Sequence, residues 1–154
     1  MAGPSDTPFK LSQIYQLGYV VADVEKAGKY YESAFGIGPF VGPVIVPMKK
    51  AIFMGRTVST KIKTAFAKSG EVQIELIQPL DSDNPYMEFL ARRGEGIHHL
   101  GFKVGDIEQV KAEFSKKGME PFFYCDLVVM KFAYYNTAEF GGLALELLWG
   151  KTEI

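Results

Sequence analysis

Apolar and polar residues follow two kinds of spacing along this chain, and the same order of spacings occurs twice. Apolar runs rich in β-branched residues at 14–21 and 97–104 have the length of buried strands. Each run is followed by an aspartate typical of a helix N-cap, Asp23 or Asp106. After each aspartate, apolar residues recur at intervals of three or four, and each helical segment ends near a glycine. A strand followed by a helix is therefore predicted to open each half of the chain.

Three further apolar runs follow the predicted helix in each half. They are predicted to be strands at 39–46, 61–68 and 72–78, and at 121–129, 131–136 and 143–149. The order βαβββ, found twice, indicates an α+β fold. Residues 85–93 are expected to form a short helix that links module one, about 14–80, to module two, about 96–149. We expect a tail at 1–12 and one domain at 13–150, because neither module has enough core to fold confidently alone.

The two halves also share a sequence repeat. QLGYVVADVE, which begins at Gln16, matches HLGFKVGDIE, which begins at His99, at an offset of 83 residues. In the last strand of each half, VQIELI matches LALELL and places Glu75 opposite Glu146. The repeat therefore puts four polar residues at equivalent positions in otherwise apolar strands.

Composition and charge exclude several classes of function. The 154 residues are 47% hydrophobic and carry a formal net charge of −1, so no basic field is available for a nucleic acid partner. The chain has one cysteine and no apolar run of about 18 residues, which argues against disulfides and a membrane span. Residues 1–10 lack an apolar stretch of signal-peptide length. We expect a soluble, cytoplasmic protein.

The four repeat-related residues indicate a metal site. An ionised glutamate between apolar neighbours is costly to bury without a cation or a hydrogen-bonding partner, and two facing glutamates would repel each other. A divalent cation removes both problems, because amide and carboxylate oxygens and one imidazole suit an octahedral site. Taken singly, each residue has an ordinary structural explanation, but together they occupy matching places. The candidate metal ligands are Gln16, Glu75, His99 and Glu146.

His98 lacks this support from the repeat. Its equivalent position is Tyr15, and strand alternation predicts that it points to the face opposite His99. We interpret it as a residue that supports a ligand or the fold.

The chain resembles the vicinal oxygen chelate superfamily, which includes glyoxalase I, bleomycin-resistance proteins and extradiol dioxygenases. The resemblance covers about 13–148 and depends on the paired βαβββ modules, on GIHHLGF, and on the strands ELIQPL and LALELL. It implies two modules that form a U-shaped mixed sheet around a metal-centred cavity, and it favours a homodimer. Within the superfamily, residues 75–104 are most similar to methylmalonyl-CoA epimerases, to which racemases of dihydrodaidzein type are related.

The resemblance also carries the metal positions onto the same four residues, with one departure. Epimerases usually have His where Gln16 stands, and the resulting set resembles that of eukaryotic glyoxalase I. Such ligands do not distinguish cobalt, nickel, zinc, manganese, iron and magnesium. A second departure is the lack of an acid in the strand TKIKTAF, where some epimerases carry a catalytic carboxylate. A base must then come from Glu75 or Glu146, or Lys63 must serve as the opposing acid.

The reaction expected at such a site is inversion of a stereocentre next to a carbonyl group through an enolate. Glu146 is the preferred base, with Glu75 as its partner or as a ligand only. The substrate is either a bulky aromatic ketone of isoflavanone type or a 2-methylacyl-CoA such as methylmalonyl-CoA. Aromatic residues in both halves favour the former, although such residues more often belong to a core or a dimer interface. The candidate substrate contacts are Phe66, Gln73, Phe132 and Tyr135.

Two alternatives remain open at the level of sequence. The first is a glyoxalase-like isomerase or lyase, which the amide of Gln16 favours. The second is a metal-free protein that binds an aromatic small molecule in the same cavity. Stoichiometric metal in the purified protein separates the binding protein from both enzymes.

Overall fold

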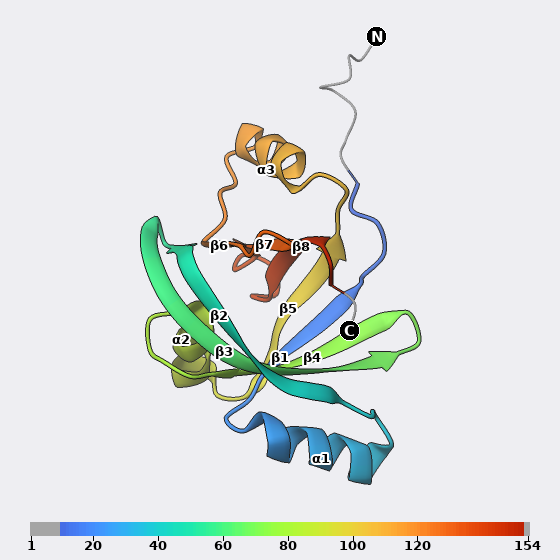
Figure 1. Ribbon diagram of the computed structural model, residues 1–154. Helices are drawn as coiled ribbons and strands as arrows, with labels where there is room; N and C mark the ends of the chain where they lie inside the picture. The colour runs from blue at the N-terminus through green and yellow to red at the C-terminus, as the bar shows by residue number, and fades with distance from the viewer. Residues whose placement is uncertain (1–9, 153–154) are drawn as a thin grey trace.

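The computed structural model describes residues 10–152 and contains the predicted order of elements (Figure 1). Module one consists of β1 (Gln16–Val20), α1 (Val24–Phe35), β2 (Val41–Phe53), β3 (Arg56–Ser69) and β4 (Val72–Pro79). The linker helix is α2 (Pro85–Arg93). Module two consists of β5 (Gly96–Lys103), α3 (Ile107–Lys116), β6 (Phe123–Asp126), β7 (Met130–Asn136) and β8 (Ala144–Gly150). Most of the expected tail lies outside the described residues.

The strands form one barrel in the order β1-β4-β3-β2-β6-β7-β8-β5. β1 is parallel to β4, β5 is parallel to β8, and β1 and β5 pair antiparallel, so the two modules meet through their first strands. On the far side, β2 and β6 pair only at Ile52 with Tyr124 and at Phe53 with Phe123. The expected U-shaped mixed sheet is therefore closed into a barrel by one short contact.

Helices α1 and α3 lie outside the barrel on opposite sides (Figure 1). Asp23 caps α1 by accepting hydrogen bonds from two backbone N–H groups at 3.1 Å, and Asp106 caps α3 in the same way with one bond. The apolar side of α3, with Ile107, Val110 and Phe114, packs on the outer face of β7 and β8. No helix in residues 10–152 is long and apolar enough to cross a membrane.

Helix α2 places an aromatic side chain inside the barrel. Asn84 caps the helix by accepting a hydrogen bond from Met87 N at 2.7 Å, and Tyr86 in the first turn is 1% exposed. The hydroxyl groups of Tyr86 and Tyr134 are 2.7 Å apart, and the Tyr134 ring stacks on Phe123 with centroids 5.8 Å apart. These three rings form an aromatic layer across the interior.

A β-bulge corrects the expected orientation of His98. The register between β1 and β5 passes from Gly18 opposite His99 to Tyr19 opposite Ile97, so His98 has no partner residue on β1. His98 is therefore turned into the barrel, where its ring contacts Tyr86 and Tyr134. The prediction that His98 and His99 point to opposite faces is wrong, because the bulge interrupts the alternation on which it depends.

Candidate active site

Four neighbouring strands bring the four repeat-related side chains together inside the barrel. In the order β4, β1, β5 and β8 these are Glu75, Gln16, His99 and Glu146. Their exposed fractions are 9%, 3%, 0% and 2%. The two glutamates occupy the outer strands of the row, so they approach the centre from opposite sides.

The donor atoms of these side chains are close to one another. The end of Gln16 that faces the cluster lies 2.7 Å from His99 Nε2, 2.9 Å from Glu146 Oε1 and 3.3 Å from Glu75 Oε1. His99 Nε2 is 3.1 Å from Glu146 Oε1 and 3.7 Å from Glu75 Oε1. Two atoms bound at right angles to one cation with bonds of about 2.1 Å are about 3 Å apart. The observed spacings fit such a cation.

Two glycines make this convergence possible. A Cβ at Gly18 would lie 2.0 Å from His99 Cε1, and a Cβ at Gly101 would lie 2.7 Å from Glu146 Oε1. Each glycine stands two residues after a ligand in the repeat, and each lies opposite a ligand of a neighbouring strand. The repeated dipeptide Leu-Gly therefore supplies the space that the ligand side chains occupy.

A chain of amides determines which end of Gln16 faces the cluster. Gln73 Nε2 donates to the Thr152 carbonyl at 3.0 Å, and this carbonyl can only accept. Gln73 therefore turns Oε1 toward Gln16, whose Nε2 donates to it at 2.6 Å. The reverse orientation of Gln16 would give bonds to the cluster but would place two amide oxygens 2.6 Å apart. We therefore assign the Gln16 oxygen to the cluster.

The resulting group of acceptors fits a divalent cation. The Gln16 oxygen faces two carboxylate oxygens and one imidazole nitrogen, and such a set is satisfied by a metal ion or by protons. In residues 10–152, His, Cys, Asp and Glu side chains alone form no group of three that could hold a metal. The candidate site adds the Gln16 amide to the side chains of Glu75, His99 and Glu146.

Burial and charge shift the pKa values of this cluster. Burial is the main cause that raises the pKa of Glu75 to about 7, while His99 opposes the rise and Glu146 adds to it. Burial alone would lower the pKa of His99, but Glu146 and Glu75 outweigh it and raise this pKa. Burial holds the pKa of His98 well below its ordinary value, with His99 contributing. His98 and His99 share a hydrogen bond between their Nδ1 atoms at 3.0 Å.

Gln16, Glu75 and Glu146 of the cluster line a cavity of about 250 Å³. Its walls are mainly apolar, and they are formed by Met48, Ile62, Phe66, Met130, Phe132 and Leu148.

Three residues with hydroxyl groups lie at the cavity or beside the cluster. Tyr86 and Tyr134 line the cavity, and Thr64 donates to Glu75 Oε2 at 2.9 Å. The sequence reasoning missed these three hydroxyl residues. The alternation of β7 and the pairing of Tyr134 with Glu146 would have identified Tyr134 once the strand register was known.

The remaining candidate residues are divided between the two faces of the sheet. Phe66 and Phe132 line the cavity, and Gln73 lies behind it in contact with Gln16. Tyr135 lies on the outer face of β7 against Phe114 of α3, with ring centroids 4.9 Å apart. Lys63 also lies outside, where its Nζ pairs with Glu25 at 3.1 Å. The expected roles of Tyr135 in substrate contact and of Lys63 as an acid are therefore corrected, because each side chain points away from the cavity.

Comparisons with known proteins agree with this architecture. The family model described as Glyoxalase/Bleomycin resistance protein/Dioxygenase superfamily matches residues 15–125. The uncharacterized protein YqjC of Bacillus subtilis is 30% identical over 104 residues, which are 66% of this chain and 65% of that protein. Mitochondrial methylmalonyl-CoA epimerase of Mus musculus is 26% identical over 73% of this chain and 57% of its own length. The matched segment thus spans about 57–65% of these curated relatives.

Solved structures with the same fold include two bacterial epimerases. A variant of Streptomyces coelicolor methylmalonyl-CoA epimerase in complex with 2-nitronate-propionyl-CoA gives a TM-score of 0.68 at 18% identity, over 93% of this chain and 97% of that chain. Methylmalonyl-CoA epimerase from Mycobacterium tuberculosis gives 0.65 at 22% identity, over 91% and 89%. At these identities the similarity shows the fold. Together with the family model, which matches most of the chain, it shows that this protein belongs to the glyoxalase/bleomycin resistance protein/dioxygenase superfamily, also called the vicinal oxygen chelate superfamily.

Proposed function

We propose that this protein is an epimerase or racemase that inverts a stereocentre next to a carbonyl group and depends on a divalent metal ion. The observation that carries the proposal is the buried cluster of Gln16, Glu75, His99 and Glu146, of which all but His99 line a mainly apolar cavity. These four residues would hold the ion. When bound, it would supply a positive charge that stabilises an enolate oxygen on the substrate.

The positions of the two glutamates support opposite roles for them in proton transfer. Glu75 on β4 and Glu146 on β8 stand at opposite ends of the row of four strands, so a substrate between them meets a carboxylate on either side. Inversion needs one group to remove the α-proton and another to return a proton to the opposite face. Thr64 restrains Glu75 by donating to Oε2, and Glu146 has no such hydroxyl partner in the described residues. We therefore assign Glu146 as the base and Glu75 as the group that returns the proton.

The cavity favours an apolar carbonyl compound. Its walls are formed mainly by aromatic, aliphatic and methionine side chains, with Lys151 as the cation among its lining residues. A volume of about 250 Å³ lies near the lower limit for ligand pockets, so the acyl group of a thioester would fit inside while the CoA portion remains outside. The named epimerase relatives support a 2-methylacyl-CoA. Phe66 and Phe132, which line the cavity, favour instead an isoflavanone-like ketone, because their rings could contact one ring of such a substrate.

Exchange of the substrate α-proton in deuterated water tests the function directly. The metal-loaded protein is incubated with methylmalonyl-CoA and, separately, with dihydrodaidzein, and exchange is followed by NMR. We expect exchange on one of the two and a loss of at least about a hundredfold on Glu146→Gln. Glu25→Gln is the matched control, because Glu25 is exposed and pairs with Lys63 outside the barrel. Absence of exchange on both substrates, with metal bound, would refute the proposal.

The same preparation tests the other functions that the fold supports. Turnover of a thiol adduct of an aldehyde, with no exchange on the two carbonyl substrates, would assign a glyoxalase-like isomerase. Binding of dihydrodaidzein without any bound metal would assign a metal-free binding protein.

We also propose that the protein is a homodimer, because the apolar side chains of Val41, Val44 and Ile45 on β2 are 49–59% exposed. Sedimentation equilibrium measures this state, and a monomer at micromolar concentration would contradict it.

A further inference from the structure

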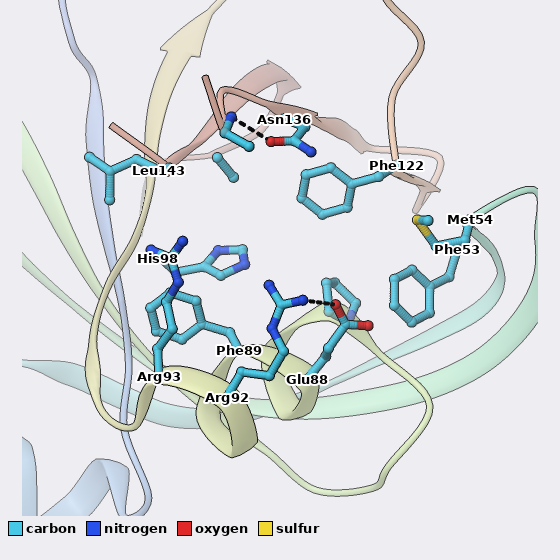
Figure 2. Close-up of a pocket in the computed structure, with 14 residues that line it drawn as sticks. Phe53, Met54, Glu88, Phe89, Arg92, Arg93, His98, Phe122, Asn136 and Leu143 are labelled. Carbon is cyan, nitrogen blue, oxygen red and sulfur yellow. Dashed lines mark hydrogen bonds and ion pairs between the residues drawn. The ribbon is translucent and has the colours of Figure 1, made fainter. Parts of the chain in front are cut away.

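A second cavity, of about 310 Å³, lies between α2 and the segment that connects β7 to β8 (Figure 2). Its lining shares no residue with the cavity that contains Glu146. Tyr86, which lines that cavity, contacts His98 of this one, with ring centroids 5.3 Å apart. The second cavity is therefore a separate chamber, and the proposed function does not use it.

Two arginines of α2 give this cavity a positive charge. Arg92 Nη1 pairs with Glu88 Oε1 at 3.7 Å, whereas Arg93 pairs with no carboxylate in residues 10–152. The Arg93 guanidinium lies 5.9 Å from the centroid of the Phe89 ring. It also lies next to Gly142, because a Cβ added to Gly142 would be 2.8 Å from Arg93 Nη2. Figure 2 shows both guanidinium groups extending from α2 toward the cavity. Among the described residues, Arg93 is thus the one cation of this cavity that pairs with no carboxylate.

Polar groups on the other walls can add hydrogen bonds. His98 is 4% exposed and lines the cavity, and its Nδ1 bonds to His99 while its Nε2 has no hydrogen-bond partner in the described residues. Asn136 Oδ1 accepts from Ala138 N at 2.6 Å, which leaves the Asn136 amide NH₂ group as a donor at the opposite wall. The Asn136 NH₂ group points to a ligand that bears an acceptor.

The remaining walls are aromatic. Phe53, Phe89 and Phe122 line the cavity, with Phe89 beside Arg93 and with Phe122 and Phe53 on the side away from Arg93 (Figure 2). A planar ring between phenylalanines gains both buried apolar area and edge-to-face contacts. One unpaired cation matches a single negative charge, and a guanidinium binds a carboxylate through two parallel hydrogen bonds.

We propose that this second cavity binds a small aromatic monocarboxylate, with its carboxylate on Arg93 and its ring among Phe53, Phe89 and Phe122. The ligand is bound intact, and no covalent step is involved. Because His98 bonds to His99, the ligand site adjoins the candidate metal site through one pair of imidazoles.

Binding of 4-fluorobenzoate to the full-length protein, followed by ¹⁹F and ¹H–¹⁵N NMR, tests the proposal. We expect saturable binding, with the largest amide shifts at Phe89, Gly142 and their neighbours. Arg93→Met should weaken binding by about tenfold or more, because a charge-assisted bond is lost. Arg92→Met, on the same helix turn but already paired with Glu88, should weaken it less. The neutral analogue 4-fluorobenzyl alcohol should bind at least about tenfold more weakly.

Further variants keep the test decisive. Ala138→Trp adds a bulky side chain at an exposed residue that lines the cavity and should abolish binding. Lys117→Met, at an exposed position at the end of α3, should not change it. Glu146→Gln should also retain binding, which separates this proposal from the proposed enzyme function. The proposal is overturned by absence of binding at millimolar benzoate, by equal affinity in Arg93→Met, or by shifts that centre on Phe66 and Leu148.

Discussion

Gln73 holds Gln16 with its amide oxygen toward Glu146. The Gln16 Nε2 donates to Gln73 Oε1 at 2.6 Å, and Gln73 is fixed in turn by its bond to the Thr152 carbonyl at 3.0 Å. Because that carbonyl only accepts, neither amide can turn over without bringing two oxygens into contact. A residue that contacts no ligand position except Gln16 therefore decides whether Gln16 offers an oxygen or an N–H group to the cluster.

Gln73→Leu should weaken metal binding by about tenfold to a hundredfold, which is the usual effect of removing a partner that orients a ligand. Titration calorimetry with Co²⁺ or Mn²⁺ measures the affinity. Gln78→Leu on the same strand is the matched control, because Gln78 accepts a hydrogen bond from Val24 N and only links β4 to α1. That variant should lose about 1 kcal/mol of stability and no metal affinity. Equal affinity of Gln73→Leu and the unmodified protein would show that Gln73 does not orient Gln16 for metal binding.

Gln16→His should preserve or strengthen metal binding, because an imidazole nitrogen at the same place is a good ligand for the metals considered. The affinity is measured by the same titration, with circular dichroism to confirm the fold. Gln16→Leu, which has no donor atom, should weaken binding in the same assay. Loss of metal from a folded Gln16→His protein would contradict the four-ligand site.

Metal loading should stabilise the whole domain. An ion at a hundred times its dissociation constant adds about 2.7 kcal/mol, and for a chain of this length that corresponds to a rise in Tm of about 5–11 °C. Differential scanning fluorimetry with and without Mg²⁺, Mn²⁺, Co²⁺, Ni²⁺ or Zn²⁺ measures the shift and ranks the metals. Glu146→Gln should lose most of the rise, whereas Glu25→Gln, which lies outside the barrel, should retain it.

Most of the correct predictions about the fold and the candidate site come from the internal repeat. Matching QLG to HLG and VQIELI to LALELL predicted the two βαβββ modules, and the structure also brings Gln16, Glu75, His99 and Glu146 together. Sequence equivalence is sufficient to predict that these four side chains meet, because equivalent strands of the two modules have the same register against their neighbours. The closure of the barrel through Ile52 and Phe53 was not predictable, since two residue pairs between β2 and β6 leave no periodic signal.

The errors arise where one residue changes the face of a strand. The bulge at His98 depends on the pairing of β5 with β1, and the sequence of β5 alone does not contain that pairing. Lys63 and Tyr135 were chosen for their chemistry without a register, and each lies on the outer face of its strand. Tyr86 comes from the linker helix, and a pattern of strands gave no reason to place a helical residue in the cavity.

Gly18→Ala should disrupt the site although it replaces no candidate ligand. The added methyl group would lie 2.0 Å from His99 Cε1, so the imidazole would have to move. We expect a loss of about 1–3 kcal/mol in the free energy of unfolding, as for other overpacked positions, and weaker metal binding. Gly28→Ala in α1 is the control, because its Cβ would meet Phe40 only at 3.7 Å; a helical alanine there should be neutral or stabilising. Unchanged metal affinity in Gly18→Ala would show that His99 does not need its observed position.

Tyr134 and Tyr135 are adjacent on β7 but face opposite sides, so they form a matched pair. The Tyr135 hydroxyl is buried and has no hydrogen-bond partner among residues 10–152, whereas the Tyr134 hydroxyl bonds to Tyr86 at 2.7 Å beside the candidate site. Tyr135→Phe removes an unsatisfied group and should leave the free energy of unfolding unchanged or raise it, with no effect on metal binding or α-proton exchange. Tyr134→Phe leaves the Tyr86 hydroxyl without its partner and should cost about 1–3 kcal/mol.

Urea denaturation measures both changes in stability, and the exchange assay measures their effect on the reaction. Because Tyr134 lines the cavity and Tyr135 does not, only Tyr134→Phe should alter the rate of exchange. A larger effect from Tyr135→Phe in either assay would mean that β7 presents the opposite face to the cavity, and the register of β7 against β8 would then be wrong.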